Sequence, residues 1–157
     1  MKSVELVEEA GPPGSQILPA PPLIIARTAD GEIWQRFEPP DLIFCSLIGV
    51  ITAELLHTNT RFLPFFRSLP CVFTLLDVSD FKSIPAEARR ASVGMNAGIR
   101  NRGCAVIGAS MPVRLVATVI LRGVALVNRH IDNPTRFFAT EDEARAWLEA
   151  RRRAVAG

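Results

Sequence analysis

Two nearly continuous apolar runs constrain the fold of this 157-residue chain more than any other feature of its sequence. They cover residues 71–76 and 104–109, and each is followed by a short polar or turn-forming stretch. A strand that is apolar at almost every position is typical of a sheet covered on both faces, and such strands occur mostly in parallel sheets flanked by helices. We therefore expect both runs to be central strands.

The segments that follow these strands predict helices. Pro85 suits a first helical turn, Glu87 favours its positive end, and an apolar stripe continues until Gly103. The next predicted helix begins at Pro112 and reaches residue 129. The unit is therefore strand, helix, strand, helix.

Strand signals also precede this unit. Residues 32–38 and 42–50 are rich in β-branched and aromatic side chains and are separated by a Pro-Pro-Asp turn, which predicts a hairpin opening the sheet. Thr52 can cap a helix running to residue 68, although Pro64 can kink or shorten that helix.

The C-terminal part predicts a last strand over residues 135–139 and a final helix. Thr140 and Glu143 have capping-box spacing, and Trp147 and Leu148 belong to the packing stripe of that helix. The sum of these elements is an α/β fold: a mixed sheet with an opening hairpin, then alternating helices and strands, with about four helices.

Residues 1–22 differ from the rest of the chain, because they combine acidic residues with five prolines and predict a disordered tail. Residues 23–157 are long enough for one hydrophobic core, so we expect a single domain there. No apolar signal follows Met1, and Arg114 and Arg122 interrupt the longest apolar segment, so we expect no membrane span. Three cysteines in apolar runs indicate free thiols and a cytoplasmic setting.

Few residues indicate chemistry. The two histidines have no clustered ligands, and no glycine-rich phosphate loop or nucleophile motif is present, so we expect neither metal, cofactor nor catalysis. One polar cluster follows the first buried strand, where open α/β sheets usually place ligands. The alternative is that its aspartate only caps a turn. The cluster consists of Asp77, Ser79, Asp80, Lys82 and Ser83.

Charge is distributed unevenly although the net charge is only +2. Residues 82–130 carry eight cationic side chains from lysine and arginine against one acid, Glu87. The arginines lie either on solvated helix faces or on a surface for an anionic partner. The candidate binding residues in this part are Glu87, Arg89, Arg90, Arg114 and Arg122.

The predicted helix over 112–129 is unusually apolar. Its polar side chains occupy one narrow arc, whereas a helix on one sheet needs an apolar stripe of only about 100°. We expect the surplus apolar surface, including Val116 and Val127, to be covered by the final helix through Trp147 and Leu148, by a second copy of the chain, or by lipid.

Three segments carry a resemblance to a known family. LLDVSDFKSIPAEAR, residues 75–89, resembles the signature of STAS domains, while VIGASMPVRLVATVILR (106–122) and RFFATEDEARAWLEARR (136–152) resemble the SpoIIAA-like group. The resemblance covers residues 32–153 and implies a STAS-like fold, related to that of CRAL-TRIO lipid-binding domains. Anti-sigma-factor antagonists of this family carry a phosphorylatable serine, but Pro85, Ala86, Glu87 and Ala88 occupy the matching positions.

This resemblance implies a regulatory module that binds a protein partner through residues 79–84 and 87–90. The alternative is a protein that binds lipid or another small apolar or anionic ligand, with an anionic membrane surface or a homodimer as further possibilities. A pocket between the 112–129 helix and the sheet would favour this alternative. Nucleic acid is not an expected partner, since the positive charges lack interleaved aromatic residues and the pI is 8.7.

Overall fold

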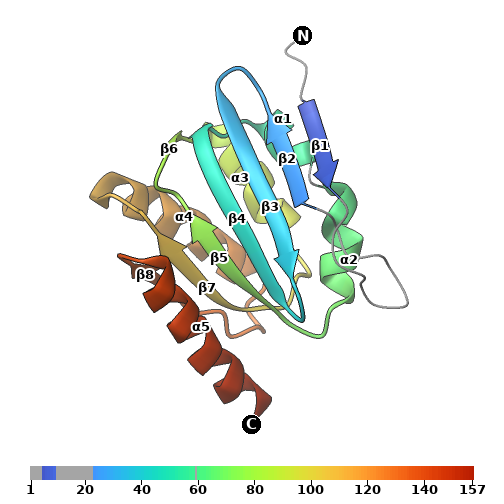
Figure 1. The fold of residues 1–157 in the computed structure, drawn as a ribbon, viewed down its shortest axis with the longest axis vertical. Helices are drawn as coiled ribbons and strands as arrows, with labels where there is room; N and C mark the ends of the chain where they lie inside the picture. Colours follow the sequence, from blue (N-terminus) through green and yellow to red (C-terminus); the bar gives the residue numbers. More distant parts are fainter. Residues whose placement is uncertain (1–4, 10–22, 59) are drawn as a thin grey trace.

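The computed structural model describes residues 5–9, 23–58 and 60–157, which form an eight-stranded mixed sheet flanked by helices (Figure 1). Seven strands follow one another in the order β1-β2-β3-β4-β5-β7-β8, and β6 pairs with the end of β4. The strands are β1 (Glu5–Glu9), β2 (Leu23–Arg27), β3 (Gly31–Glu38), β4 (Leu42–Val50), β5 (Val72–Asp77), β6 (Phe81–Ser83), β7 (Asn101–Ile107) and β8 (Thr135–Phe138).

The N-terminal half of the sheet is antiparallel. β3 and β4 form the predicted hairpin, with Glu38 opposite Leu42 at its turn and Gly31 opposite Gly49 at its far end. The hairpin does not open the sheet, however, because β1 and β2 extend it beyond β3. The expected disordered tail over residues 1–22 is thus corrected for Glu5–Glu9, since pairing with β2 satisfies the backbone there; residues 1–4 and 10–22 lie outside the described residues.

The C-terminal half is parallel, as the two apolar runs predict. β5 lies between β4 and β7, and β8 closes this edge beside β7. Phe73, Leu75, Ala105 and Val106 are fully buried. β6 was not predicted from the sequence; it forms because Gly49 and Val50 at the end of β4 offer backbone groups to Phe81 and Ser83.

The described residues form five α-helices and one 3-10 helix, where the sequence predicts about four helices. The segment 52–68 is divided because Pro64 lacks an amide hydrogen and starts a new helix. Thr52 caps the first piece, as expected, by accepting a hydrogen bond from the Leu55 amide at 3.3 Å. The helices are α1 (Ala53–Thr58), η1 (Thr60–Phe62), α2 (Leu63–Ser68), α3 (Ala86–Met95), α4 (Met111–Val127) and α5 (Glu141–Ala156).

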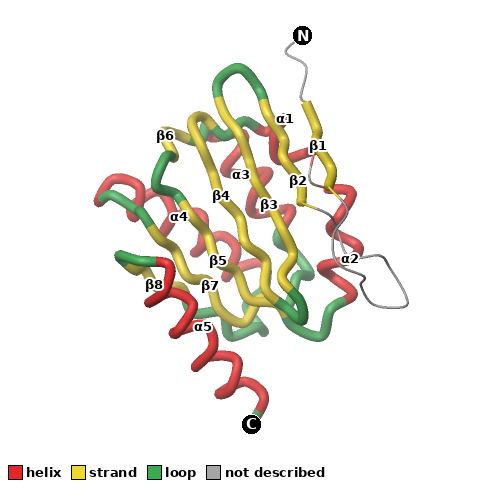
Figure 2. The backbone as a smooth tube through the Cα atoms, in the orientation of Figure 1, coloured by secondary structure: helices red, strands yellow, loops and turns green. Residues whose placement is uncertain are grey.

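These helices lie on both faces of the sheet (Figure 2). α5 covers one face over β5, β7 and β8, where Ala144 and Leu148 pack against Phe73, and its capping box at Thr140 and Glu143 is present. α1, α3 and α4 cover the other face over the middle of the sheet. The candidate site lies between the sheet and the helices α3 and α4.

Candidate ligand-binding cavity

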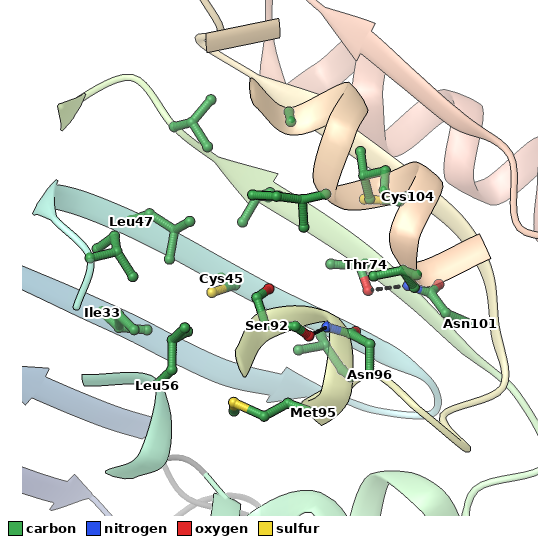
Figure 3. A pocket seen from close by; sticks show the side chains of 18 of the residues that line it. Ile33, Cys45, Leu47, Leu56, Thr74, Ser92, Met95, Asn96, Asn101 and Cys104 are labelled. Carbon is green, nitrogen blue, oxygen red and sulfur yellow. Dashed lines mark hydrogen bonds between the residues drawn. The ribbon is translucent and has the colours of Figure 1, made fainter. Parts of the chain in front are cut away.

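A cavity of about 230 Å³ lies between the sheet and the helices α3 and α4 (Figure 3). Strands β3, β4, β5 and β7 form its floor, and α3 and α4 form much of its roof. Part of the surplus apolar surface predicted for the 112–129 helix faces this cavity. The inward side chains of α4 that line the cavity are Val113, Val116, Ala117, Ile120, Leu121 and Val124.

The cavity has an apolar part and a more polar part. Ile33, Leu47 and Leu56 lie together at one end, whereas Thr74, Asn96 and Asn101 gather toward the other (Figure 3). The polar side chains are partly paired with each other or with backbone. Asn101 Nδ2 donates to Thr74 Oγ1 at 2.8 Å, and Asn96 Nδ2 donates to the Ser92 carbonyl at 2.8 Å.

In the described part of the chain, no Asp, Glu, Lys, Arg or His side chain lines this cavity. Cys45 and Cys104 do line it, and burial raises the pKa of each thiol to about 12. Both therefore stay protonated at neutral pH, and a protonated buried thiol is a poor nucleophile and metal ligand. The cavity is electrically neutral.

Two contacts fix the roof of the cavity. Helices α3 and α4 approach closely at Gly123, where an added β-carbon would lie 2.9 Å from a methyl group of Val93. Asn128 is buried at the end of α4; its Nδ2 donates to the Asn96 carbonyl at 2.9 Å and its Oδ1 accepts from the Gly98 amide at 3.1 Å. These bonds join the C-terminal ends of both helices.

The predicted polar cluster lies at the C-terminal end of β5, outside the cavity. Asp77 Oδ1 accepts hydrogen bonds from the Ser79 amide at 2.9 Å and the Ser79 hydroxyl at 2.6 Å, so the aspartate caps its own turn, which is the alternative weighed from the sequence. Asp80 and Lys82 line an open surface depression with the β2–β3 turn, and Ser83 is exposed beside it.

The remaining predicted residues are spread over the helices. Glu87 and Arg90 are exposed near the start of α3, and Arg89 donates to the Ile84 carbonyl at 3.3 Å. Arg114 donates to the Ala109 carbonyl and lies over the Phe137 ring, at 5.2 Å from its centre, while Arg122 is exposed on α4. The structure does not bring the ten residues together, and none lines the cavity.

The outer face of α4 is apolar and uncovered in the described part of the molecule. Leu115 is 68% exposed and Leu126 is 73% exposed. The expected cover by Trp147 and Leu148 is wrong, because α5 lies on the opposite face of the sheet. Val116 was expected to point outward but lines the cavity, whereas Val127 is exposed as expected. The exposed apolar side chains are Met111, Leu115, Val119, Leu126 and Val127.

A pocket beneath this helix was expected to favour the ligand-binding alternative, but the residues that line it were not predicted from the sequence. The available signal was the polar side chains placed within or next to buried strands, Thr74 and Asn101, and the asparagines at the helix ends. Within the described ranges, no cluster of three or more His, Cys, Asp or Glu residues could hold a metal ion, and no helix has the length and hydropathy needed to cross a membrane.

Comparisons with known proteins bear on the fold. No protein-family model matches the chain, and no curated protein matches it. Among solved structures, the chain is similar to an uncharacterized protein of the DUF3478 family with a SpoIIAA-like fold from Shewanella loihica PV-4. The TM-score is 0.55 at 19% sequence identity, and the match covers 74% of this chain and 91% of that one. The chain therefore has a SpoIIAA-like, STAS-type fold, as its sequence segments predict.

Proposed function

We propose that this domain is a non-catalytic module that binds a small, largely apolar ligand between its sheet and the helices α3 and α4. The observation that carries this proposal is the neutral cavity of about 230 Å³. An engineered cavity of about 150 Å³ with apolar walls takes up benzene. By that standard, this cavity accommodates a molecule of roughly nine non-hydrogen atoms.

The cavity favours the ligand-binding alternative over the protein-interaction interpretation of the sequence. Protein interiors are normally close-packed, so a space of this size between the sheet and two helices offers room for a ligand. The protonated thiols of Cys45 and Cys104 and the uncharged lining support a binding role without covalent chemistry.

Substitution of Ala117 tests this function. Ala117 lies on α4 and lines the cavity, so the ring of an Ala117→Phe variant would occupy ligand space. We expect the wild-type protein to bind ethylbenzene with a Kd of about 0.1 mM. The Ala117→Phe variant should bind it at least roughly tenfold more weakly while keeping its melting temperature, because the ring fills an existing void. Chemical-shift titration measures both affinities.

The matched control is Ala125→Phe, since Ala125 is on the same helix but exposed. This variant should bind ethylbenzene as the wild type does. Absence of ethylbenzene binding to the wild-type protein, or equal binding by the two variants, would contradict the proposed function.

A second candidate function rests on the outer face of α4. We infer that this face associates with an anionic phospholipid surface. Exposed Leu115 and Leu126 supply apolar area, while exposed Arg122 on the same helix and Arg129 just beyond it supply positive charge. α4 contains no acidic residue, so pairing two copies through this face would place arginines against arginines. Charge complementarity thus favours an anionic bilayer over a second copy.

Vesicle sedimentation tests this association. The wild-type protein should bind vesicles of phosphatidylserine and phosphatidylcholine more strongly than vesicles of phosphatidylcholine alone, and added salt should weaken the binding. Replacing both Leu115 and Leu126 with Gln should reduce the partition coefficient by roughly tenfold or more, because both side chains lose apolar contact.

The matched control is Trp34→Gln, because Trp34 is also exposed but lies on β3 rather than on α4. This variant should sediment as the wild type does. A wild-type dimer that the leucine substitutions dissociate would show instead that the face binds a second copy.

A further inference from the structure

We propose that the ligand of this cavity is an uncharged molecule with a carboxamide-like group, which pairs with the side-chain amide of Gln35 and the hydroxyl of Ser92. Such a group carries a carbonyl oxygen and an N–H side by side. The inference rests on the proposed function and specifies the chemical class of the ligand.

The sheet directs Gln35 toward the cavity. Gln35 lies two residues from Ile33 on β3, and side chains two positions apart in a strand point to the same face. Ile33 lines the cavity, and so does Cys45, which lies directly opposite Gln35 in the pairing of β3 with β4. The neighbours Trp34 and Arg36 are exposed on the other face. The accessible surface of Gln35 therefore lies on the cavity side of the sheet, and Gln35 is one of the lining residues.

Ser92 reaches the same part of the cavity from the opposite wall. It lies on α3 and also lines the cavity. Figure 3 shows Ser92 opposite Cys45, which is the cross-strand neighbour of Gln35. A ligand held between the sheet and α3 at this point can contact both polar side chains.

Gln35 and Ser92 differ from Asn96 and Asn101 in their hydrogen bonding. Asn101 Nδ2 donates to Thr74 Oγ1, and Asn96 Nδ2 donates to the Ser92 carbonyl, each at 2.8 Å. Within the residues that the structure describes, neither the Gln35 side chain nor the Ser92 hydroxyl makes a hydrogen bond. Both residues are half-buried, and none of these polar atoms is enclosed. They are accessible to a ligand.

The chemistry of these two side chains selects the ligand group. The Gln35 amide offers N–H donors beside an oxygen acceptor, and the Ser92 hydroxyl both donates and accepts. A second carboxamide pairs with the Gln35 amide through two parallel hydrogen bonds. A ketone satisfies only the donors and would cover the Gln35 oxygen without pairing it, which is unfavourable.

The lining also excludes ionised ligands. None of the side chains described as lining the cavity is charged, so a carboxylate inside would have no cationic partner. Removal of an unpaired carboxylate from water is strongly unfavourable. An uncharged carboxamide is therefore accepted where the ionised acid of the same size is rejected.

Four probes of closely matched size test the inference: ethylbenzene, acetophenone, benzamide and benzoate. Benzamide differs from acetophenone by an amino group in place of a methyl group, so the pair isolates the N–H donors. We expect the wild-type protein to bind benzamide at least as tightly as acetophenone, although benzamide is better hydrated in water. Benzoate should show no binding. Chemical-shift titration measures the affinities.

The Gln35→Met variant removes the amide and keeps a side chain of similar length. The ratio of benzamide affinity to acetophenone affinity should fall by roughly fivefold to tenfold in this variant, and by roughly twofold to fivefold in Ser92→Ala. Ethylbenzene binding should persist in both, which reports that the cavity is intact. If Gln35→Met does not fold, Gln35→Leu serves the same comparison, and the wild-type ranking of the probes depends on neither variant.

Ser46→Ala is the matched control. Ser46 follows Cys45 on β4 and pairs with Trp34, so its side chain lies on the other face of the sheet and does not line the cavity. This variant should keep the wild-type ratio of benzamide affinity to acetophenone affinity.

The outcomes separate this inference from the proposed function. Binding of benzoate, a wild-type preference for acetophenone, or an unchanged ratio in the Gln35 or Ser92 variant would overturn the carboxamide assignment, while ethylbenzene binding leaves the cavity function in place. If ethylbenzene does not bind to the wild-type protein, the proposed function is wrong and this inference falls with it.

Discussion

Replacing Gly108 with alanine is expected to destabilise the domain by about 3 kcal/mol. Gly108 has a φ of +73°, a backbone conformation that costs about 1 to 2 kcal/mol for a residue with a β-carbon. An added β-carbon would also lie 2.7 Å from Ser79 Cα, so backbone would have to move. The overlap adds a packing penalty of about 1 to 3 kcal/mol. Urea denaturation measures the loss.

Gly94→Ala is the matched control for this substitution. Gly94 lies in α3, and no atom outside its own helical surroundings is within 4 Å of an added β-carbon. Alanine is the better helix former, so this variant should be unchanged or more stable by about 0.5 kcal/mol. Equal stability of the two variants would show that Ser79 and Gly108 are not in close contact.

The contact between Gly108 and Ser79 also explains why the predicted polar cluster after β5 does not form a pocket. Gly108 follows β7, and Ser79 belongs to the turn that Asp77 caps after β5. Their close approach fills the space between the ends of these neighbouring strands. Open α/β sheets often place ligands there, but this chain uses that position for its own backbone.

Stability is expected to fall as the pH drops from about 4.5 toward 2, and Glu38 should account for much of this loss. The Glu38 carboxylate accepts two hydrogen bonds from Arg145, at 2.8 and 3.0 Å, and one from Arg36 at 2.9 Å. The hydrogen bonds from Arg145, partly opposed by burial and aided by Arg36, lower the pKa of Glu38 from 4.5 to about 2. The unfolded chain therefore binds a proton first, which favours unfolding in this pH range.

The magnitude follows from the exposure of the pair. The Glu38 side chain is 27% exposed and that of Arg145 is 33% exposed, so solvent screens the interaction. We expect a contribution of about 1 to 2 kcal/mol at neutral pH. The Glu38→Gln variant should lose this amount at pH 7 and converge with the wild type near pH 2, as measured by urea denaturation across the pH range.

Glu87→Gln is the control, because Glu87 is exposed at the start of α3 and does not join α5 to the sheet. This variant should follow the wild-type pH profile within about 0.5 kcal/mol. A Glu38→Gln variant with an unchanged acid profile would show that the ion pair between β3 and α5 does not stabilise the fold.

Local sequence signals determined most of the elements. The apolar runs at 71–76 and 104–109 correspond to the buried strands β5 and β7, because strands covered on both faces are apolar at nearly every position. The capping box at Thr140 and the turn between β3 and β4 depend on residues a few positions apart, so they too are readable locally. β2, with the sequence LIIAR, carries a β-branched strand signal of its own that was overlooked. β6 was not predicted because it has only three residues and pairs with the end of β4.

Local patterns in the sequence were sufficient to predict the STAS-type α/β fold and the apolar character of the helix over 112–129. Which side of that helix is buried depends on its packing, because an apolar side chain satisfies a core, a cavity wall and a lipid surface equally well. α5 packs on the opposite face of the sheet, so Leu115 and Leu126 stay exposed while Ala117 faces the cavity. The cavity is lined by segments distant in sequence, and only their packing brings them together.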